Sequence, residues 1–369
     1  IMILVENLLN ILKKNKINFF TGVPDSILKK FSSAVEKFSS KQHIVAVNEG
    51  SAASIGIGYY LSTKRTPCIY LQNSGLSNAI NPLISIASKE VYAIPLLLMI
   101  GWRGSPKIKD EPQHMAKGKI TPELLKLLKI EYCVLRNSRD LLKLSSLIKK
   151  SNKTKKIVAC LIEKDILKSK SVKKSHVTNK NKVFRKNFIE EFLKHIPLNS
   201  KIISTTGYSS RELMQLRKEG KLVRGKDFYM VGGMGHSSMV AMGYSIHSNS
   251  TVFCLDGDGS ALMHLGSLRT VGFNSGKKFK HILFNNNSHE SVGGQATNAE
   301  GIDFKNLVKS VGYKNYFKIK EKSELKNIIK KFIKTKGPSF LEVKIKNGSL
   351  NNLPRPKNLL QIKKIFMDK

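Results

Sequence analysis

The chain has 369 residues, of which 41% are hydrophobic, and its 64 lysines and arginines against 26 acidic residues give a formal net charge of +38. This apolar content excludes a disordered chain, and the length suggests about two domains, each with its own core. Only ten of the basic residues are arginine and the lysines are spread along the whole chain, so we expect a compositional bias and no nucleic-acid partner.

Strand-like and helix-like segments alternate in the first half of the chain. Residues 4–15 place apolar side chains on one helical face, and short strands are predicted at 17–20, 43–47, 68–71 and 94–100. Helices are predicted at 51–62 and 76–88. The longest apolar run, 91–102, is too short to span a bilayer and contains Pro95, so we expect no membrane association. The alternation predicts a parallel sheet with helices on both faces.

A polar stretch rich in lysine and serine separates this half from a second one of similar size. Residues 166–182 lack apolar periodicity and are predicted to be a linker. Beyond it, strands are predicted at 201–204, 228–231, 251–255, 280–284 and 339–345, with helices at 261–273 and 322–336. The sequence therefore predicts an α/β protein with two domains, residues 1–165 and 183–369.

The cysteines and the first residues bear on the cellular compartment. Cys68, Cys133, Cys160 and Cys254 are scattered, with no CxxC pair and no histidine at ligand spacing, which favours reduced thiols over disulfides or zinc. Residues 1–16 carry polar side chains early and lack a small-residue cleavage site, so we expect no signal peptide. We therefore expect a cytoplasmic protein.

The strongest chemical signal is the segment Gly257-Asp258-Gly259-Ser260, directly after the strand at 251–255. A helix and a strand follow and lead to Asn285-Asn286-Asn287, with 25 residues between Gly259 and Asn285, so both segments are expected at the same edge of the sheet. Oxygen ligands of this kind suit Mg²⁺, and glycines before a helix start offer backbone N–H groups to a diphosphate. Alone, the Gly-Asp-Gly segment favours a tight turn capped by Asp258, but the asparagines at this spacing reverse that preference.

This GDG-x25-NN arrangement resembles the motif of the thiamine diphosphate (ThDP)-dependent decarboxylases. The resemblance implies a pyrimidine-binding (PYR-type) domain at 1–165, a similar diphosphate-binding (PP-type) domain at 183–369, and no middle domain at this length. It also implies that Glu49, after the strand at 43–47, hydrogen-bonds to N1′ of the cofactor pyrimidine. Without the resemblance, Glu49 is an acidic residue that complements a helix dipole.

Longer segments resemble the phosphonopyruvate decarboxylases within that family. They span nearly the whole chain, at 19–26, 48–50, 72–83, 100–114, 205–213, 231–238 and 285–297. Three positions depart from the usual family residue, with Asn287 in place of Gly, Glu290 in place of Asp, and Ala296 in place of Pro. Asparagine tolerates left-handed backbone, whereas the longer Glu290 leaves the role of that carboxylate open.

The resemblance implies a role for each matching residue, with ThDP and Mg²⁺ as cofactors. The expected metal ligands are Asp258, Asn286 and the Ser288 carbonyl. The expected cofactor contacts are Glu49, Thr205, Thr206, Gly232, Met234, Gly257, Asp258, Gly259, Ser260 and Asn286. The expected substrate contacts are Asp25, Ser26, Gln72, Asn73, Arg103 and Lys109. The expected catalytic residues are Glu49 and two candidate proton carriers, His114 and His289. A role as an ordinary core methionine is the alternative for Met234, and a structural role fits Arg103 and Lys109 equally well.

The resemblance implies decarboxylation of phosphonopyruvate, a small anionic 2-oxo acid, to phosphonoacetaldehyde and CO₂ in phosphonate biosynthesis of the 2-aminoethylphosphonate type. It further implies self-association, at least into a homodimer with the active site at the interface. Two alternatives remain. Sulfopyruvate decarboxylase, which gives sulfoacetaldehyde, differs by one substrate charge. A non-catalytic basic scaffold that binds nucleic acid has no need to keep Glu49, Asp258 and Asn286 together.

Overall fold

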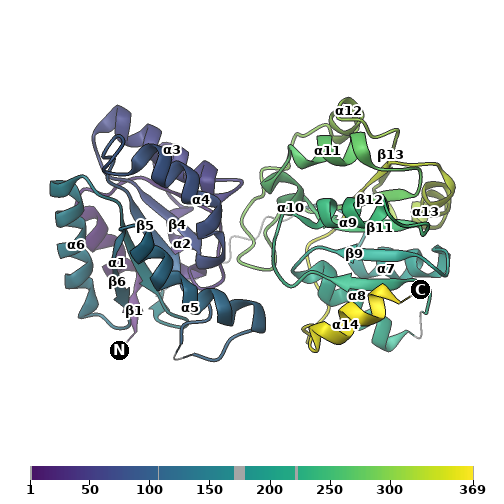
Figure 1. Cartoon of the computed structure of the whole chain (residues 1–369), viewed down its shortest axis with the longest axis horizontal. Helices are drawn as coiled ribbons and strands as arrows, with labels where there is room; N and C mark the ends of the chain where they lie inside the picture. The colour runs from purple at the N-terminus through teal and green to yellow at the C-terminus, as the bar shows by residue number, and fades with distance from the viewer. Residues whose placement is uncertain (1, 107, 170–178, 221–222, 369) are drawn as a thin grey trace. The chain divides into compact units, whose positions relative to one another are not determined.

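The computed structural model describes residues 2–106, 108–169, 179–220 and 223–368, which divide into two compact units (Figure 1). Unit 1 comprises Ile1–His176 with Val292–Gln295, and unit 2 comprises Val177–Ser291 with Ala296–Lys369. Residues 170–178 of the predicted linker lie outside the described residues. The beginning of that linker instead forms β8 (Leu167–Lys168), which pairs in parallel with β1 (Ile3–Leu4) because the Leu167 side chain is buried in unit 1.

Unit 1 is built on a six-stranded parallel sheet with the order β3-β2-β4-β5-β7-β6. Its strands are β2 (Phe20–Gly22), β3 (His43–Val45), β4 (Cys68–Gln72), β5 (Leu97–Gly101), β6 (Glu131–Leu135) and β7 (Val158–Ile162). Its helices are α1 (Val5–Lys14), α2 (Lys29–Val35), α3 (Glu49–Thr63), the 3-10 turn η1 (Asn73–Gly75), α4 (Leu76–Pro82), the π-helical turn η2 (Leu83–Ala87), α5 (Pro112–Leu127) and α6 (Asp140–Thr154).

Successive strand residues of unit 1 point to opposite faces of the sheet, as the pleat requires. Tyr70 and Met99 pack with α1, α2 and α6, whereas Leu71 and Ile100 pack with α3, α4 and α5. The prediction of a parallel sheet covered on both faces is therefore confirmed.

Unit 2 repeats this architecture with the strand order β10-β9-β11-β12-β14-β13. Its strands are β9 (Lys201–Ser204), β10 (Lys226–Tyr229), β11 (Val252–Gly257), β12 (Phe279–Asn285), β13 (Asn315–Ile319) and β14 (Ser339–Lys344). Its helices are α7 (Arg185–His195), α8 (Tyr208–Glu219), α9 (Ser237–Ser245), α10 (Asp258–Met263), α11 (Ser267–Asn274), α12 (Phe304–Ser310), the 3-10 turn η3 (Lys322–Glu324), α13 (Leu325–Lys334) and α14 (Leu359–Met367). One core lies under α7, α8 and α13, and the other under α9, α11, α12 and α14.

Numbered within each unit, both six-stranded sheets have the order 2-1-3-4-6-5. In each sheet the first and third strands are neighbours, β2 with β4 and β9 with β11. The second strand lies on one side of this pair and the later strands lie on the other, so the strand order reverses between the two neighbours. Ligands of open α/β sheets bind at the carboxyl ends of strands at such a switch point. The topology thus marks one candidate ligand edge in each unit.

Several predicted elements differ from the structure in their boundaries: the strand expected at 94–100 is Leu97–Gly101, the strand expected at 228–231 is Lys226–Tyr229, and the helices expected at 76–88 and 322–336 are each divided, into α4 with η2 and η3 with α13. The strand expected at 17–20 lies at Phe20–Gly22, in register with Cys68–Tyr70 of β4. The single helix expected at 261–273 is two helices, α10 and α11, because the chain leaves helical geometry at His264 before Gly266, a residue type that weakens helix interiors. Apolar residues continue through the break, so periodicity does not reveal it. In the described parts of the chain, no helix has the length and apolar content needed to cross a bilayer.

Candidate functional site

The carboxyl edge of the unit 2 sheet brings the two ends of the GDG-x25-NN motif together. Asp258, the first residue of α10, is only 3% exposed. Its Oδ1 accepts a hydrogen bond from the Gly259 N–H (2.7 Å), and its Oδ2 accepts from the N–H groups of Asn286 (3.2 Å) and Asn287 (2.6 Å). Burial raises the pKa of Asp258 to about 6, although these N–H donors act in the opposite direction.

The loop after β12 presents the other predicted metal ligands. Asn286 and Ser288 are buried, and the Asn286 Oδ1 accepts from the Ser288 N–H (3.1 Å). Asn287 adopts a φ of 57°, the left-handed backbone that asparagine tolerates in place of the family's glycine. This loop therefore brings an amide oxygen and backbone carbonyls to the start of α10, where its N–H groups contact the Asp258 carboxylate.

The polar groups predicted for the diphosphate lie at the β9–β11 switch point. The Oγ atoms of Thr205 and Ser260 are 3.1 Å apart, and Ser260 Oγ also accepts from the Gly235 N–H (3.1 Å). Thr206 is half-buried and precedes Gly207, whose φ of 96° leads into α8. The first turns of α8 and α10 thus offer backbone N–H groups at this edge, as anion binding requires.

The glycines of this edge differ in how much space surrounds them. A Cβ at Gly259 would lie 2.7 Å from Cε1 of His289, whereas a Cβ at Gly257 or Gly232 would meet nothing within 4 Å. Gly232 and the half-buried Met234 lie on the loop between β10 and α9. Of these three glycines, Gly259 is the one that packing within the unit requires. The cofactor contacts expected of Gly232 and Met234 stay predictions.

The two histidines predicted as proton carriers lie in different surroundings. His289 is buried against Gly259, and burial lowers its pKa to about 4, so its imidazole is neutral at physiological pH. His114 lies in the first turn of α5 in unit 1, where its backbone N–H donates to the Glu111 carbonyl (2.8 Å). The roles of His114 and His289 as proton carriers stay predictions.

Glu49 is held at the start of α3 in unit 1. The Asn48 side chain caps the helix by accepting from the Ser51 N–H (2.8 Å), and Glu49 follows as the first helical residue, 5% exposed. Its Oε2 accepts from Asn78 Nδ2 (2.8 Å). Gly75 packs against the carboxylate so closely that a Cβ there would lie 1.8 Å from Oε1. The Glu49 carboxylate therefore has one defined position.

Five of the six predicted substrate contacts belong to one network at the carboxyl edge of unit 1. Asp25 is buried and accepts from the N–H groups of Ile27 (2.9 Å) and Leu28 (3.0 Å) and from Gln72 Nε2 (2.6 Å). Burial raises the pKa of Asp25, with these bonds opposing the effect. Asn73 Nδ2 donates to the Arg103 carbonyl (2.9 Å), and its Oδ1 accepts from the Arg103 N–H (3.2 Å).

The charge of Arg103 is compensated within its own loop. Arg103 Nε donates to Asp110 Oδ2 (2.6 Å), Nη2 donates to Asp110 Oδ1, and Nη1 donates to Ser26 Oγ (3.1 Å). Burial would raise the pKa of Asp110, but the hydrogen bonds from Arg103 hold it below its usual range. Lys109, the sixth predicted residue, is exposed. Arg103 therefore has a structural partner that the sequence interpretation did not anticipate.

Comparison with known proteins shows which family carries these features. Residues 2–126 match the thiamine pyrophosphate enzyme N-terminal TPP binding domain, and residues 205–343 match the C-terminal TPP binding domain. The phosphonopyruvate decarboxylase of Streptomyces viridochromogenes is 31% identical, over 91% of this chain and 87% of that protein. The chain belongs to the phosphonopyruvate decarboxylase family of thiamine pyrophosphate enzymes. The protein is thus a thiamine diphosphate (thiamine pyrophosphate) decarboxylase, which confirms the family, fold and enzyme class expected from the motifs.

Two further relatives bear on the substrate. The phosphonopyruvate decarboxylase of Streptomyces hygroscopicus is 30% identical, over 91% of this chain and 86% of that protein. The sulfopyruvate decarboxylase of Methanosarcina acetivorans is 25% identical, over 95% of this chain and 93% of that protein. Both kinds of decarboxylase are therefore related to this chain along most of its length.

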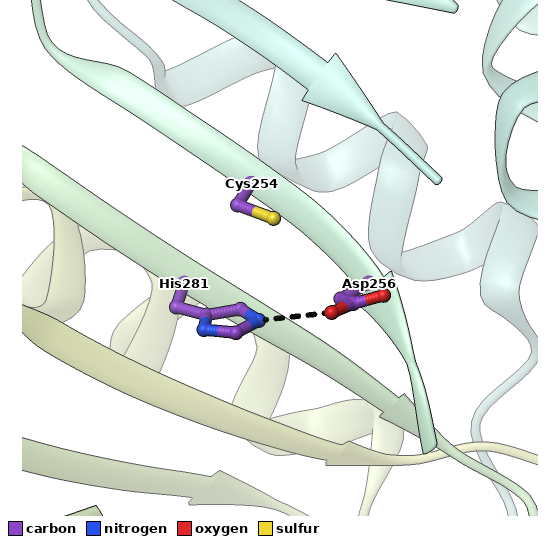
Figure 2. Close-up of side chains that lie close together, drawn as sticks. All are labelled: Cys254, Asp256 and His281. Atoms are coloured by element: carbon purple, nitrogen blue, oxygen red, sulfur yellow. Dashed lines mark ion pairs between the residues drawn. The ribbon is translucent and has the colours of Figure 1, made fainter. Parts of the chain in front are cut away.

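A second group of titratable side chains lies beneath the Gly-Asp-Gly turn of this decarboxylase. Cys254 and Asp256 on β11 and His281 on β12 are buried and face one another (Figure 2). His281 Nε2 lies 3.4 Å from Asp256 Oδ2, and His281 Nδ1 lies 2.8 Å from the Tyr313 hydroxyl. Burial raises the pKa of Cys254, which keeps the thiol protonated and a poor metal ligand. Since Asp256 Oδ1 also accepts from the Gly257 N–H (2.9 Å), the cluster braces the turn that carries Asp258.

Several residues around the decarboxylase sites escaped the sequence interpretation. Gly75 and Asn78, which fix Glu49, lie inside the segment 72–83 that carried the family resemblance but were assigned no role. His236 and His264 stack with ring centroids 4.6 Å apart, next to Gly235. His236 directly follows Met234-Gly235, so its place in the sequence could have marked it as a residue of the site. His264 lies at the unexpected helix break, and nothing in the sequence near it indicated a role.

Proposed function

We propose that this chain decarboxylates phosphonopyruvate with ThDP and Mg²⁺ and releases phosphonoacetaldehyde and CO₂. The observation that carries the proposal is the contact of Asp258 with Asn286 and Asn287, in a chain that phosphonopyruvate decarboxylases match over 91% of its length. The sulfopyruvate relative covers the chain equally well but at lower identity. Phosphonopyruvate is therefore the first substrate to test.

Mg²⁺ fits the donor set in unit 2. The Asp258 carboxylate, the Asn286 amide oxygen and the Ser288 carbonyl are hard oxygen ligands on one loop and one helix start. Because burial raises the pKa of Asp258 to about 6, a divalent cation beside it would stabilise the ionised carboxylate. We assign these three groups to Mg²⁺, with Thr205, Ser260 and the N–H groups of α8 and α10 toward the diphosphate.

The chain's own residues would bind, orient and exclude water. When bound, the thiazolium of ThDP accepts the electron pair that is released as CO₂ leaves. Glu49, fixed by Asn78 and Gly75, would hydrogen-bond to the pyrimidine ring and hold its tautomer. The buried surroundings of Glu49 and Asp258 would keep water from the reacting groups.

On the substrate side, we propose that the exposed ammonium group of Lys109 attracts the anionic substrate. Arg103 is compensated by Asp110, so its guanidinium orders the loop and offers less net charge to an anion. This observation also favours sulfopyruvate as a second candidate, because a sulfonate carries one charge fewer than a phosphonate. Asp25, Ser26, Gln72 and Asn73 remain the proposed polar contacts of the substrate pocket.

We further propose that the enzyme works as at least a homodimer in phosphonate biosynthesis, where loss of CO₂ would pull an unfavourable preceding step forward. Some relatives are separate alpha and beta subunits of sulfopyruvate decarboxylase. In Methanococcus maripaludis, the alpha subunit matches 31% of this chain and the beta subunit matches 41%. This supports association as part of the family's design. An active monomer in sedimentation under assay conditions would contradict the dimer.

The function is tested by CO₂ release from phosphonopyruvate and from sulfopyruvate, with ThDP and Mg²⁺ and with Glu49→Gln as control. We expect phosphonopyruvate to have the higher kcat/KM and the variant to lose turnover of both. Preference for sulfopyruvate would overturn the substrate assignment and keep the cofactor assignment. Release from neither would overturn both. Lys109→Ala should raise the KM for the preferred substrate while the affinity for ThDP is retained.

A further inference from the structure

A buried cluster of charges lies behind the proposed metal ligand Asn286. Arg185, the first residue of α7 and 5% exposed, places Nη2 3.1 Å from Glu290 Oε2 and Nη1 3.3 Å from Glu212 Oε2. Glu290 Oε2 also accepts from Asn286 Nδ2 (3.3 Å), and Glu290 Oε1 accepts from the Gly348 N–H. Charged groups are costly to bury unless they are paired, so each member of this cluster depends on the others.

These contacts determine which way the Asn286 amide points. An amide presents an oxygen on one side and an NH₂ group on the other. In the observed orientation, the NH₂ group meets the Glu290 carboxylate and the oxygen meets the Ser288 N–H (3.1 Å). The flipped amide would set two acceptors against each other at Glu290 and two donors at Ser288. The carboxylate therefore selects the orientation in which Oδ1 faces the Ser288 N–H, on the opposite side of the amide from Glu290.

We propose that Glu290, held in place by Arg185, is a positioning residue that keeps the Asn286 oxygen directed toward Mg²⁺. The inference rests on the proposed function, since it takes Asn286 as a metal ligand. Glu290 stands where the family more usually has aspartate, and its longer side chain here joins Arg185, Asn286 and the Gly348 backbone. The residue thereby links a helix start more than one hundred positions away in sequence to the metal loop.

The test measures metal affinity rather than turnover. Mn²⁺ is titrated into protein with saturating ThDP, free Mn²⁺ is followed by electron paramagnetic resonance, and Mg²⁺ affinity is obtained by competition. We expect Glu290→Ala to weaken binding of both metals about 10–100-fold, the range for residues that orient a metal ligand. Glu290→Gln keeps an oxygen acceptor for Asn286 Nδ2, so it should weaken binding less than Glu290→Ala. If Glu290→Ala does not fold, the metal affinity of Glu290→Gln is the measurement that tests the proposal.

A matched control separates positioning from general loss of stability. Arg217 and Asp227 form another mostly buried ion pair in unit 2, with Nη2 and Oδ1 2.8 Å apart and no contact with Asn286 among the described hydrogen bonds. Asp227→Asn should lower the unfolding temperature but leave metal affinity within about twofold. Unchanged affinity in folded Glu290 variants, or equal weakening in Asp227→Asn, would overturn the positioning role alone. A wild-type protein that binds neither metal with ThDP would overturn the proposed cofactor site as well.

Discussion

Substituting Gly75 by alanine tests whether the position of the Glu49 carboxylate governs activity. A Cβ at residue 75 would lie 1.8 Å from Glu49 Oε1 and 2.2 Å from Cδ, whereas ordinary contact begins at 3.4 Å. The carboxylate must therefore move by about 1.6 Å, the difference between 3.4 and 1.8 Å. Gly75 has a φ of −89° and a ψ of −6°, which alanine adopts without strain, so the effect is steric and not conformational.

A displacement of about 1 Å in a catalytic group can cost about 100-fold in rate. We expect Gly75→Ala to lower kcat/KM for CO₂ release at least about 100-fold, with a loss of stability of about 1–3 kcal/mol from overpacking. Gly58→Ala on α3 is the matched control, because a Cβ there meets nothing within 4 Å and should leave kcat/KM unchanged. A folded Gly75→Ala protein with kcat/KM within about threefold of wild type would refute the reasoning.

Three other substitutions address the metal ligand, the Arg103 loop and a buried histidine. Because a change one contact away from a metal costs about 10–100-fold, Asp258→Asn should weaken Mn²⁺ binding more than about 100-fold in the same resonance titration; retained affinity would exclude Asp258 as a ligand. Arg103→Met leaves Asp110 buried without its partner and should lower the free energy of unfolding, measured in urea, by about 3 kcal/mol. The double variant Arg103→Met/Asp110→Asn should lose less stability than the sum of the two single variants. A loss equal to that sum would contradict a coupled pair. Burial lowers the pKa of His43 to about 4, so below about pH 6.5 the unfolded chain takes up a proton that the folded chain refuses. Wild type should accordingly lose up to about 3 kcal/mol of stability between pH 6.5 and 4 that His43→Gln does not lose, and parallel pH profiles would show that His43 is not responsible.

The parts of the fold and site that depend on short stretches of sequence were predictable. The turn at Asp258 and the asparagines after the next strand could be predicted to lie together, because the carboxyl ends of parallel strands meet at one sheet edge. The left-handed backbone of Asn287 is consistent with its residue type, since asparagine tolerates this conformation. The Arg185–Glu290 pair was not predictable, because 105 positions separate the two residues and neither lies in a motif with the other. Arg103 was expected at the substrate; its pairing with Asp110 depends on how the intervening loop folds back, which charge spacing alone does not specify. The break at His264 escaped for a similar reason, since burial continues on both sides of it.

Each of the two units closes its own pair of cores. The residues of the unit 1 cores lie between Ile3 and Leu167, and those of the unit 2 cores lie between Val183 and Phe366. Among the residues that the structure describes, each of the four hydrophobic clusters draws its members from one half of the chain, so the peptide link between the halves is not needed to complete any of these clusters. Two polypeptides divided between Leu167 and Val183 would each keep every member of their own clusters. That freedom gives a physical reason why relatives of this chain exist as alpha and beta subunits.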